Sequence, residues 1–154
     1  MWMIPALLGM TGLDQWLKRR VETHPALLGK KLLKNSLVIR KHENQGFMLN
    51  KYEKQPGRVK ALTTAVTGMV GISWMVLLFR KGQFFLKLGM TMIFSGALGN
   101  LIDRYRKGAV TDYVSVCRGN CPKLKKLVFN LADALVFLGA VISMVSECMS
   151  AGKH

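Results

Sequence analysis

The chain has 154 residues and a formal net charge of +15, and half of its residues are hydrophobic. This length accommodates one compact domain, residues 1–154, and no second one. The charge alone would suggest a nucleic-acid partner, but the basic residues lie between apolar segments, and the sequence has no zinc finger, RNP motif or basic helix-turn-helix. We therefore expect membrane lipids as partners, because their anionic headgroups attract such residues, and no nucleic acid.

The first apolar segment covers residues 2–17 and is interrupted by Pro5 and Asp14. It has no basic leader and no small-x-small cleavage site, so we expect it to remain as a first membrane span. Three further segments approach the length of about 20 apolar residues that crosses a hydrocarbon core. They are residues 61–79, 84–102 and 127–145. The sequence therefore predicts an all-α membrane protein with four transmembrane helices.

The connections between these spans have patterns of their own. Residues 25–34 are amphipathic and predict a short helix at the membrane interface. Residues 36–40 and 110–116 are rich in β-branched residues and predict strands, whereas Asn-Gln-Gly at 44–46 predicts a turn. The connection 80–83 is so short that the spans on either side of it are expected to be antiparallel neighbours.

The basic residues leave the orientation of the spans open. Lys and Arg in short loops normally mark the cytoplasmic side. By that rule the connections 19–60 and 104–126 would lie inside, but the first of them is long, and the rule weakens there.

Two aspartates stand out at the edges of apolar segments. Asp133 is the one charged residue within 127–145, and Asp112 lies in the apolar stretch 109–116. A carboxylate at membrane depth costs roughly 2.5–3.5 kcal/mol on insertion scales, so it is usually buried, paired and functional. Two such groups close together would share one proton, as an aspartic hydrolase requires. Taken singly, either could instead make a structural polar contact or belong to a proton path.

Several other polar residues follow helical spacing near these aspartates. Asn100, Asp103 and Arg104 are at i, i+3 and i+4 and share a helix face, and Asn130 stands three residues before Asp133. Asp103 and Arg104 favour a simple ion pair at a helix end over a catalytic role. In the same way, Asp14 and Lys18 at i, i+4 are first a helix-stabilising pair. Small residues, Gly96 and Gly99, would allow a neighbouring helix to approach closely.

Five sequence blocks carry a family resemblance. Gly-Asn-Leu-Ile-Asp-Arg at 99–104, Val-Thr-Asp-Tyr at 110–113 and Phe-Asn-Leu-Ala-Asp at 129–133 resemble the signature blocks of signal peptidase II, the lipoprotein signal peptidase. Leu-Asp-Gln-x-x-Lys at 13–18 and Asn-x-Gly at 44–46 agree with it. The order and spacing of the blocks match over essentially the whole chain.

The resemblance implies an intramembrane aspartic endopeptidase in the bacterial cytoplasmic (inner) membrane. Such an enzyme has four transmembrane helices, both termini in the cytoplasm and a small β-cradle on the outer side. This orientation is opposite to the one that the count of basic residues would give, and we follow the resemblance. Its substrates are prolipoproteins whose cysteine carries diacylglycerol, cut just before that cysteine. No metal and no cofactor is implied, and we expect a monomer.

By this match the catalytic pair is Asp112 and Asp133. The remaining matched positions are expected to bind substrate or support the pocket. They are Asn44, Gly46, Asn100, Asp103, Arg104, Asn130, Asp14 and Lys18.

The chain departs from the family pattern after Gly46. Phe47 and Met48 stand where the family has small residues, so a divergent paralogue with a different substrate choice or reduced activity is one interpretation. An alternative from another class is a non-enzymatic membrane protein, a proton-coupled transporter or an assembly subunit.

Cys117 and Cys121 enclose a turn-like tripeptide and could form a disulfide or remain as thiols. Trp2, Trp16 and Trp74 are expected at the membrane interface or against lipid.

Overall fold

The computed structural model describes residues 2–32, 36–46, 55–116 and 127–151. Phe47, Met48, Cys117 and Cys121 lie outside these residues, so the expectations about them are not addressed by the structure.

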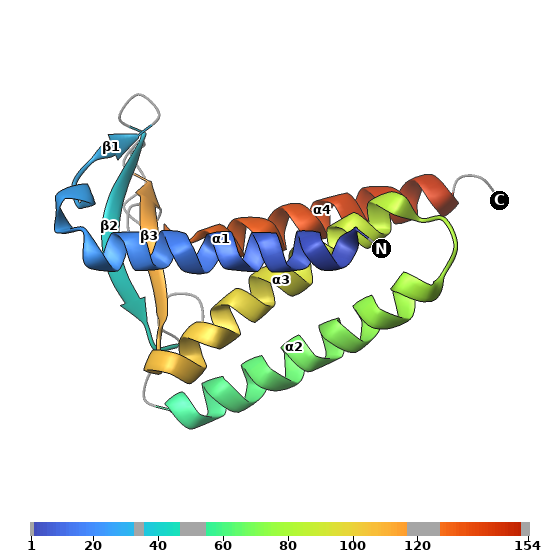
Figure 1. Cartoon of the computed structure of the whole chain (residues 1–154), viewed down its shortest axis with the longest axis horizontal. Helices are drawn as coiled ribbons and strands as arrows, with labels where there is room; N and C mark the ends of the chain where they lie inside the picture. The colour runs from blue at the N-terminus through green and yellow to red at the C-terminus, as the bar shows by residue number, and fades with distance from the viewer. Residues whose placement is uncertain (1, 33–35, 47–54, 117–126, 152–154) are drawn as a thin grey trace.

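Four long helices form the body of the protein (Figure 1), as the sequence predicts. They are α1 (Met3–Thr23), α2 (Pro56–Phe79), α3 (Phe84–Lys107) and α4 (Leu131–Ala151). Helix α3 packs against the other three, and α2 joins it through the short connection that makes the two antiparallel. Within the described residues, α2, α3 and α4 are long and apolar enough to cross a membrane, whereas α1 is helical but more polar.

The helix bounds differ from the expected spans. Helix α2 begins at Pro56, since proline is well suited to the first turn of a helix. Helix α3 continues to Lys107 and ends at Gly108, whose φ of 76° is the left-handed conformation typical of a glycine helix stop. Helix α4 begins only at Leu131, because Val128–Phe129 pair as a strand instead.

A four-stranded antiparallel sheet closes one end of the helix bundle (Figure 1). Its strands, in sheet order, are β1 (Lys31–Leu32), β2 (Leu37–Asn44), β3 (Val110–Val116) and β4 (Val128–Phe129). The main pairing is β2 with β3, from Leu37 opposite Val116 to Asn44 opposite Val110. Both predicted strands are therefore confirmed, and the two connections that contain them form one sheet.

The short helix expected over residues 25–34 is limited to one 3-10 turn, Pro25–Leu27. Gly29 follows with a φ of 83°, which a continuing right-handed helix does not allow. From there the backbone pairs with β2: Gly29 N–H donates to Ile39 O at 2.9 Å, and Ile39 N–H donates to Lys30 O at 3.0 Å. Sheet pairing therefore replaces the rest of the expected helix.

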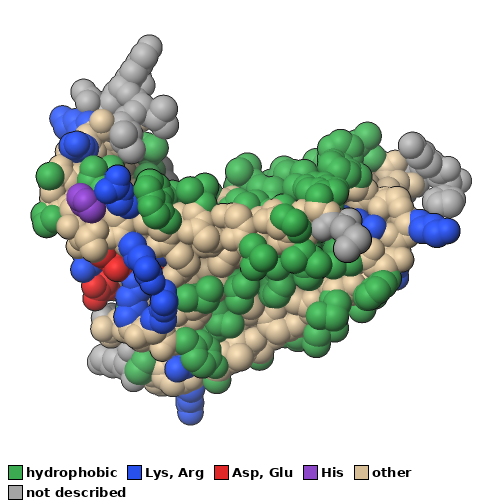
Figure 2. Space-filling view, in the orientation of Figure 1, with side chains coloured by type: hydrophobic (Ala, Val, Ile, Leu, Met, Phe, Trp, Pro, Cys, Tyr) green, Lys and Arg blue, Asp and Glu red, His purple; other side chains and the backbone are tan. Residues whose placement is uncertain are grey.

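Large apolar side chains cover the outside of the helices (Figure 2). Ile72 and Phe79 on α2 are 67% and 86% exposed, and Phe137 on α4 is 70% exposed. So large an apolar surface is unfavourable in contact with water, whereas the hydrocarbon chains of lipids can cover it. Basic side chains gather at the sheet end, with a few at the opposite end (Figure 2). The chain is a multi-pass membrane protein.

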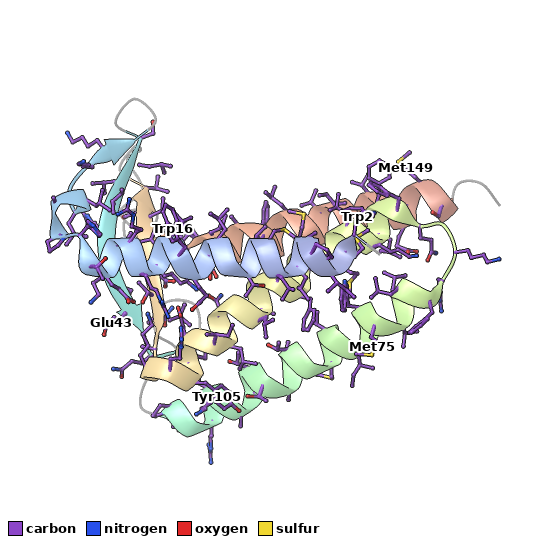
Figure 3. The ribbon with its side chains drawn as sticks, viewed as in Figure 1. Trp2, Trp16, Glu43, Met75, Tyr105 and Met149 are labelled. Atoms are coloured by element: carbon purple, nitrogen blue, oxygen red, sulfur yellow. The ribbon has the colours of Figure 1, made fainter. Side chains whose placement is uncertain are left out.

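The tryptophans divide between surface and core. Trp2 and Trp16 are exposed toward opposite ends of α1 (Figure 3), as expected for membrane interfaces. The same expectation of an interface or lipid position is wrong for Trp74, which is buried against Met3 and Leu7. Its indole N–H donates to Thr91 Oγ1 at 2.8 Å, and this bond satisfies the polar group inside the bundle.

Helices α3 and α4 approach closely because glycines line their contact. A Cβ atom at Gly139 would lie 2.5 Å from Gly89 O, and one at Gly96 would overlap Ala132 O. One turn further along the same face of α3, a Cβ atom at Gly99 would lie 2.6 Å from Asp14 Oδ2 on α1 and 3.7 Å from Ala132 Cβ on α4. The expectation that Gly96 and Gly99 permit close approach is confirmed, and this contact brings the first turn of α4 against the polar face of α3.

Candidate active site

Asp112 and Asp133 come from different elements and meet where the sheet joins the bundle. Asp112 is on β3, and Asp133 is in the first turn of α4. Asn130 connects them: its Nδ2 donates to Asp112 Oδ1 at 2.6 Å, and its backbone N–H donates to Asp133 Oδ2 at 3.2 Å. The two carboxyl groups are also close enough for the charge of Asp133 to affect the titration of Asp112.

The first turn of α4 is held by hydrogen bonds from three sides. Asn130 acts as the N-cap, since its Oδ1 accepts the N–H of Asp133 at 2.9 Å, while Asp133 accepts the N–H of Asn130 in return. This is the reciprocal arrangement of a capping box. The N–H of Leu131 donates to Tyr113 Oη at 3.1 Å, and the N–H of Ala132 donates to Asp14 Oδ1 at 3.0 Å. The position of Asp133 is therefore fixed by α1 and β3 as well as by its own helix.

The end of β2 contacts Asp112 from the opposite side. Asn44 Nδ2 lies 3.4 Å from Asp112 Oδ2, and Asn44 Oδ1 accepts the N–H of Gly46 at 3.1 Å. Arg104 Nη2 donates to Gly46 O at 2.8 Å. The predicted turn at 44–46 thus joins the aspartate on β3 to the end of α3.

A buried lysine, Lys18, lies behind the aspartates. Its Nζ is 2.8 Å from Asp14 Oδ2, 3.1 Å from Asp103 Oδ2 and 3.0 Å from Asn100 Oδ1. Asn100 Nδ2 in turn donates to Asp133 Oδ1 at 3.1 Å. The Asp14–Lys18 pair is confirmed, and Asp103 forms its ion pairs with Lys18 and, at 3.8 Å, with Lys107.

The surroundings of Asp112 favour its protonated form. Burial, and after it the negative charge of Asp133, raise the pKa of Asp112 to about 6 from an ordinary value of 3.8. Hydrogen bonds from Asn130 and Asn44 and the charge of Lys18 act in the opposite direction but do not cancel this. Burial also raises the pKa of Tyr113 to about 12, so its hydroxyl stays protonated.

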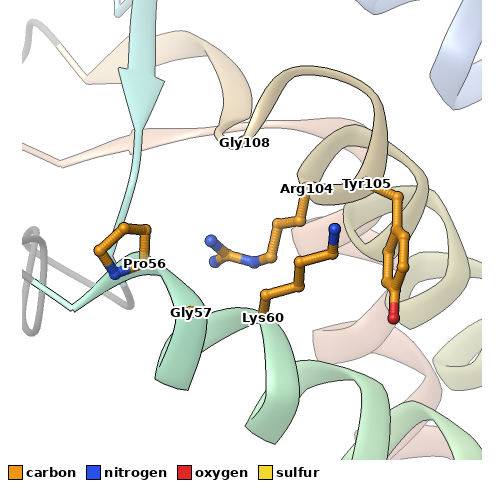
Figure 4. A pocket seen from close by; sticks show the side chains of 6 residues that line it. All are labelled: Pro56, Gly57, Lys60, Arg104, Tyr105 and Gly108. Atoms are coloured by element: carbon orange, nitrogen blue, oxygen red, sulfur yellow. The ribbon is translucent and has the colours of Figure 1, made fainter.

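A cavity of about 260 Å³ lies beside these groups, between the start of α2 and the end of α3 (Figure 4). Arg104 extends from α3 into it, and Lys60 reaches from α2 toward the ring of Tyr105, with Nζ 3.8 Å from the ring centroid. The charges of Asp112 and Asp133 act on Arg104, which therefore links this cavity to the aspartates.

Every residue expected in the site from the sequence belongs to one connected set of hydrogen bonds and ion pairs around the two aspartates. Three further residues were not anticipated. Gln15 donates to Asp103 Oδ1 at 3.2 Å and to Gly99 O at 3.1 Å, Thr111 N–H donates to Asp103 Oδ2 at 3.2 Å, and Tyr113 caps α4. Each stands next to a matched aspartate within the blocks 13–18 and 110–113, and this adjacency is the signal that could have identified them.

Solved structures and known sequences resemble this chain over most of its length. One solved bacterial membrane enzyme superposes with a TM-score of 0.79 at 20% identity, covering 98% of this chain and 90% of its own. A second gives a TM-score of 0.71 at 22% identity, covering 94% and 90%. At these identities the likeness establishes the fold alone.

Sequence relatives are more specific. The lipoprotein signal peptidase of Mesorhizobium japonicum is 31% identical over 135 residues, which cover 88% of this chain and 78% of the relative. That of Brucella ovis is 31% identical over 137 residues, covering 88% and 82%. The family model for signal peptidase (SPase) II matches residues 6–149. The chain therefore belongs to the signal peptidase II family.

Proposed function

We propose that this protease is an aspartic endopeptidase of the bacterial cytoplasmic membrane that removes the signal peptide from prolipoproteins. Its substrates carry diacylglycerol on the cysteine that follows the cleaved bond. Family membership supports the substrate class. The observation that carries the aspartic mechanism is the Asn130 bridge between the buried carboxyl group of Asp112 and the half-buried one of Asp133, which come from different elements.

In this mechanism the two aspartates share one proton. The ionised carboxylate removes a proton from a water molecule, whose oxygen attacks the scissile carbonyl carbon, while the protonated carboxyl donates its proton to the carbonyl oxygen. When the tetrahedral intermediate collapses, the C–N bond breaks, the leaving amine takes a proton from the pair, and a hydroxyl of the intermediate returns its proton to the pair as the carbonyl re-forms. Like-charge repulsion at short range favours the singly protonated state that this cycle needs.

The positions of the two aspartates favour different roles. Asp133 lies in the first turn of α4, where the helix dipole stabilises a carboxylate, and it accepts the backbone N–H of Asn130 there. Asp112 lies on a strand, and burial raises its pKa to about 6, which favours it as the carrier of the shared proton. We therefore assign Asp133 as the base and Asp112 as the acid.

The cavity beside Arg104 is the proposed place for part of the substrate next to the scissile bond. It opens at the sheet end of two membrane helices, α2 and α3, where a lipid-anchored peptide would approach from the bilayer. Arg104 lines this cavity and donates to Gly46 O, while Asn44 contacts both Gly46 and Asp112. These polar groups suit the peptide groups of an extended substrate.

Replacing each aspartate by asparagine tests the proposal. Asp112→Asn and Asp133→Asn should each abolish cleavage of a diacylglyceryl-modified prolipoprotein by the purified protein, with normal membrane insertion. Glu43→Gln is the matched control, because Glu43 is an exposed acid on β2 that pairs only with Lys41 among the contacts described. Normal cleavage by both aspartate variants would refute the aspartic mechanism.

A further inference from the structure

We propose that Lys18 is a positioning residue for the aspartate pair, because its ammonium group holds the side chains that fix the backbone in front of Asp112 and Asp133. The proposal rests on the aspartic mechanism proposed above and adds a role for a residue that does not touch the reacting atoms.

The ammonium group of Lys18 has all its hydrogen-bonding capacity in use. It has three N–H donors, and three acceptors lie within 3.1 Å: Asp14 Oδ2, Asp103 Oδ2 and Asn100 Oδ1. Lys18 is only 1% exposed, and the two carboxylates are 0% and 2% exposed. Burying a charge costs much free energy unless the ion is fully paired, so all three contacts of Lys18 are needed to keep it buried.

Each carboxylate held by Lys18 also holds the backbone one residue before an aspartate of the pair. Asp14 Oδ1 accepts the N–H of Ala132 at 3.0 Å, directly before Asp133. Asp103 Oδ2 accepts the N–H of Thr111 at 3.2 Å, directly before Asp112. The ammonium group of Lys18 is therefore linked, through one carboxylate in each case, to the backbone that directly precedes Asp133 and to the backbone that directly precedes Asp112.

Asn100 supplies a third link. Lys18 donates to Asn100 Oδ1, so the amide group of Asn100 is turned with its Nδ2 toward Asp133 Oδ1. Asn130 Nδ2 also donates to Asn100 Oδ1, at 3.2 Å, so two donors lie on the oxygen side of this amide. Lys18 is the charged one of the two, and it helps to direct Nδ2 of Asn100 toward Asp133.

The charge of Lys18 also acts on the pair directly. The charged and titratable groups around Asp112 are Lys18 from α1, Arg104 from α3, Asp133 from α4, Tyr113 on its own strand, and His42 opposite it on β2. Asp14 and Asp103 lie one contact further away, as the partners of Lys18. Among the groups around Asp112, Lys18 is a buried cation that lowers the pKa of Asp112. Removing its charge should raise this pKa further, and Asp112 would then keep its proton to a higher pH.

The test compares Lys18→Met, Lys18→Arg and the control Lys41→Met, an exposed lysine on β2. We measure kcat and KM for a diacylglyceryl lipopeptide in detergent micelles between pH 4 and pH 9. For Lys18→Met we expect kcat to fall by about 100-fold with KM little changed, since misplacing reacting groups by about 1 Å has an effect of that size. In its pH–rate profile, the fall of kcat on the alkaline side should move to higher pH.

Lys18→Arg keeps the charge but not the compact geometry of an ammonium group. We expect its alkaline limb to stay at the wild-type pH, while kcat falls by about 10-fold or more. Lys41→Met should behave as the wild type in both respects. If Lys18→Met does not fold, as judged by thermal unfolding, Lys18→Arg still decides, because a wild-type kcat in that variant would overturn the proposal.

The two proposals fail in different ways. If the aspartate variants are inactive and Lys18→Met keeps the wild-type kcat and pH profile, only the role of Lys18 is refuted. A loss confined to KM would also refute it, because that result would place Lys18 in substrate binding. Cleavage by the aspartate variants would instead refute the mechanism itself.

Discussion

Asp14 Oδ1 accepts the backbone N–H of Ala132 at 3.0 Å, although the two residues are 118 positions apart in the chain. This contact ties the first helix to the start of the last one, one residue before Asp133. Asp14 also pairs with Lys18. Its side chain therefore joins a buried ion pair to the first turn of α4, the helix that carries the proposed base.

Asp14→Ala should therefore destabilise the protein strongly. It leaves the ammonium group of Lys18 with one carboxylate fewer and the N–H of Ala132 without its acceptor, and breaking a buried pair costs about 3–5 kcal/mol. Thermal unfolding in detergent micelles measures the effect. Asp14→Asn retains an oxygen for Ala132 and should lose less, and an unchanged midpoint in Asp14→Ala would contradict the structural role given to this contact.

Asn130 has two separable roles, as helix cap and as bridge. Asn130→Ala removes both, so we expect a loss of about 1 kcal/mol in stability for the cap and about a 100-fold loss of kcat for the bridge. Asn130→Ser keeps an N-cap oxygen but has no Nδ2 to donate to Asp112. It should retain near-normal stability and still lose activity. Equal activity in Asn130→Ser and the wild type would show that the bridge does not matter for catalysis.

The raised pKa of Asp112 gives a pH dependence with a definite sign. If Asp112 carries the shared proton, kcat/KM should fall as the pH rises through about 6, because the proton is then lost. A pH–rate profile with a lipopeptide substrate measures this limb. Activity that instead rises through the same range would reverse the assignment of acid and base.

The same pKa makes a prediction about stability. Because the pKa of Asp112 is about 6 in the folded protein and 3.8 ordinarily, ionising it opposes folding, and this penalty grows as the pH rises from 3.8 to about 6. Asp112→Asn removes the charge, so the variant should unfold at a higher temperature than the wild type at pH 8. At pH 4 the two should differ little. A variant less stable than the wild type at pH 8 would contradict this expectation.

The glycine contact between α3 and α4 should tolerate no side chain. Gly139→Leu would force its Cβ to 2.5 Å from Gly89 O, and overpacking of this kind typically costs about 1–3 kcal/mol. Because this packing also places the first turn of α4, we expect lower activity as well. Gly68→Leu on α2 is the matched control, since a Cβ at Gly68 has no atom within 4 Å. Equal unfolding temperatures for the two variants would contradict the close approach.

Some of the structure was determined by the sequence alone. Segments 61–79, 84–102 and 127–145 are apolar enough to require lipid, and the strand predicted at 110–116 has the bounds observed for β3. The resemblance to signal peptidase II identified the residues that gather around Asp112 and Asp133, and helical spacing predicted that Asn100, Asp103 and Arg104 share one face of α3. The Asp14–Lys18 pair was predictable for the same reason, since it is local to one helix.

Only the tertiary structure decided the contacts between elements distant in the chain. Asp103 could have paired with its neighbour Arg104, but Lys18 from α1 lies against it, and Trp74 is buried rather than at the interface because Met3 and Leu7 pack on it. The helix expected over 25–34 gives way to sheet pairing with β2. The physical reason is common to all of these: helical spacing and hydropathy specify which face of an element is polar, whereas the partner of that face depends on how the helices and the sheet pack together.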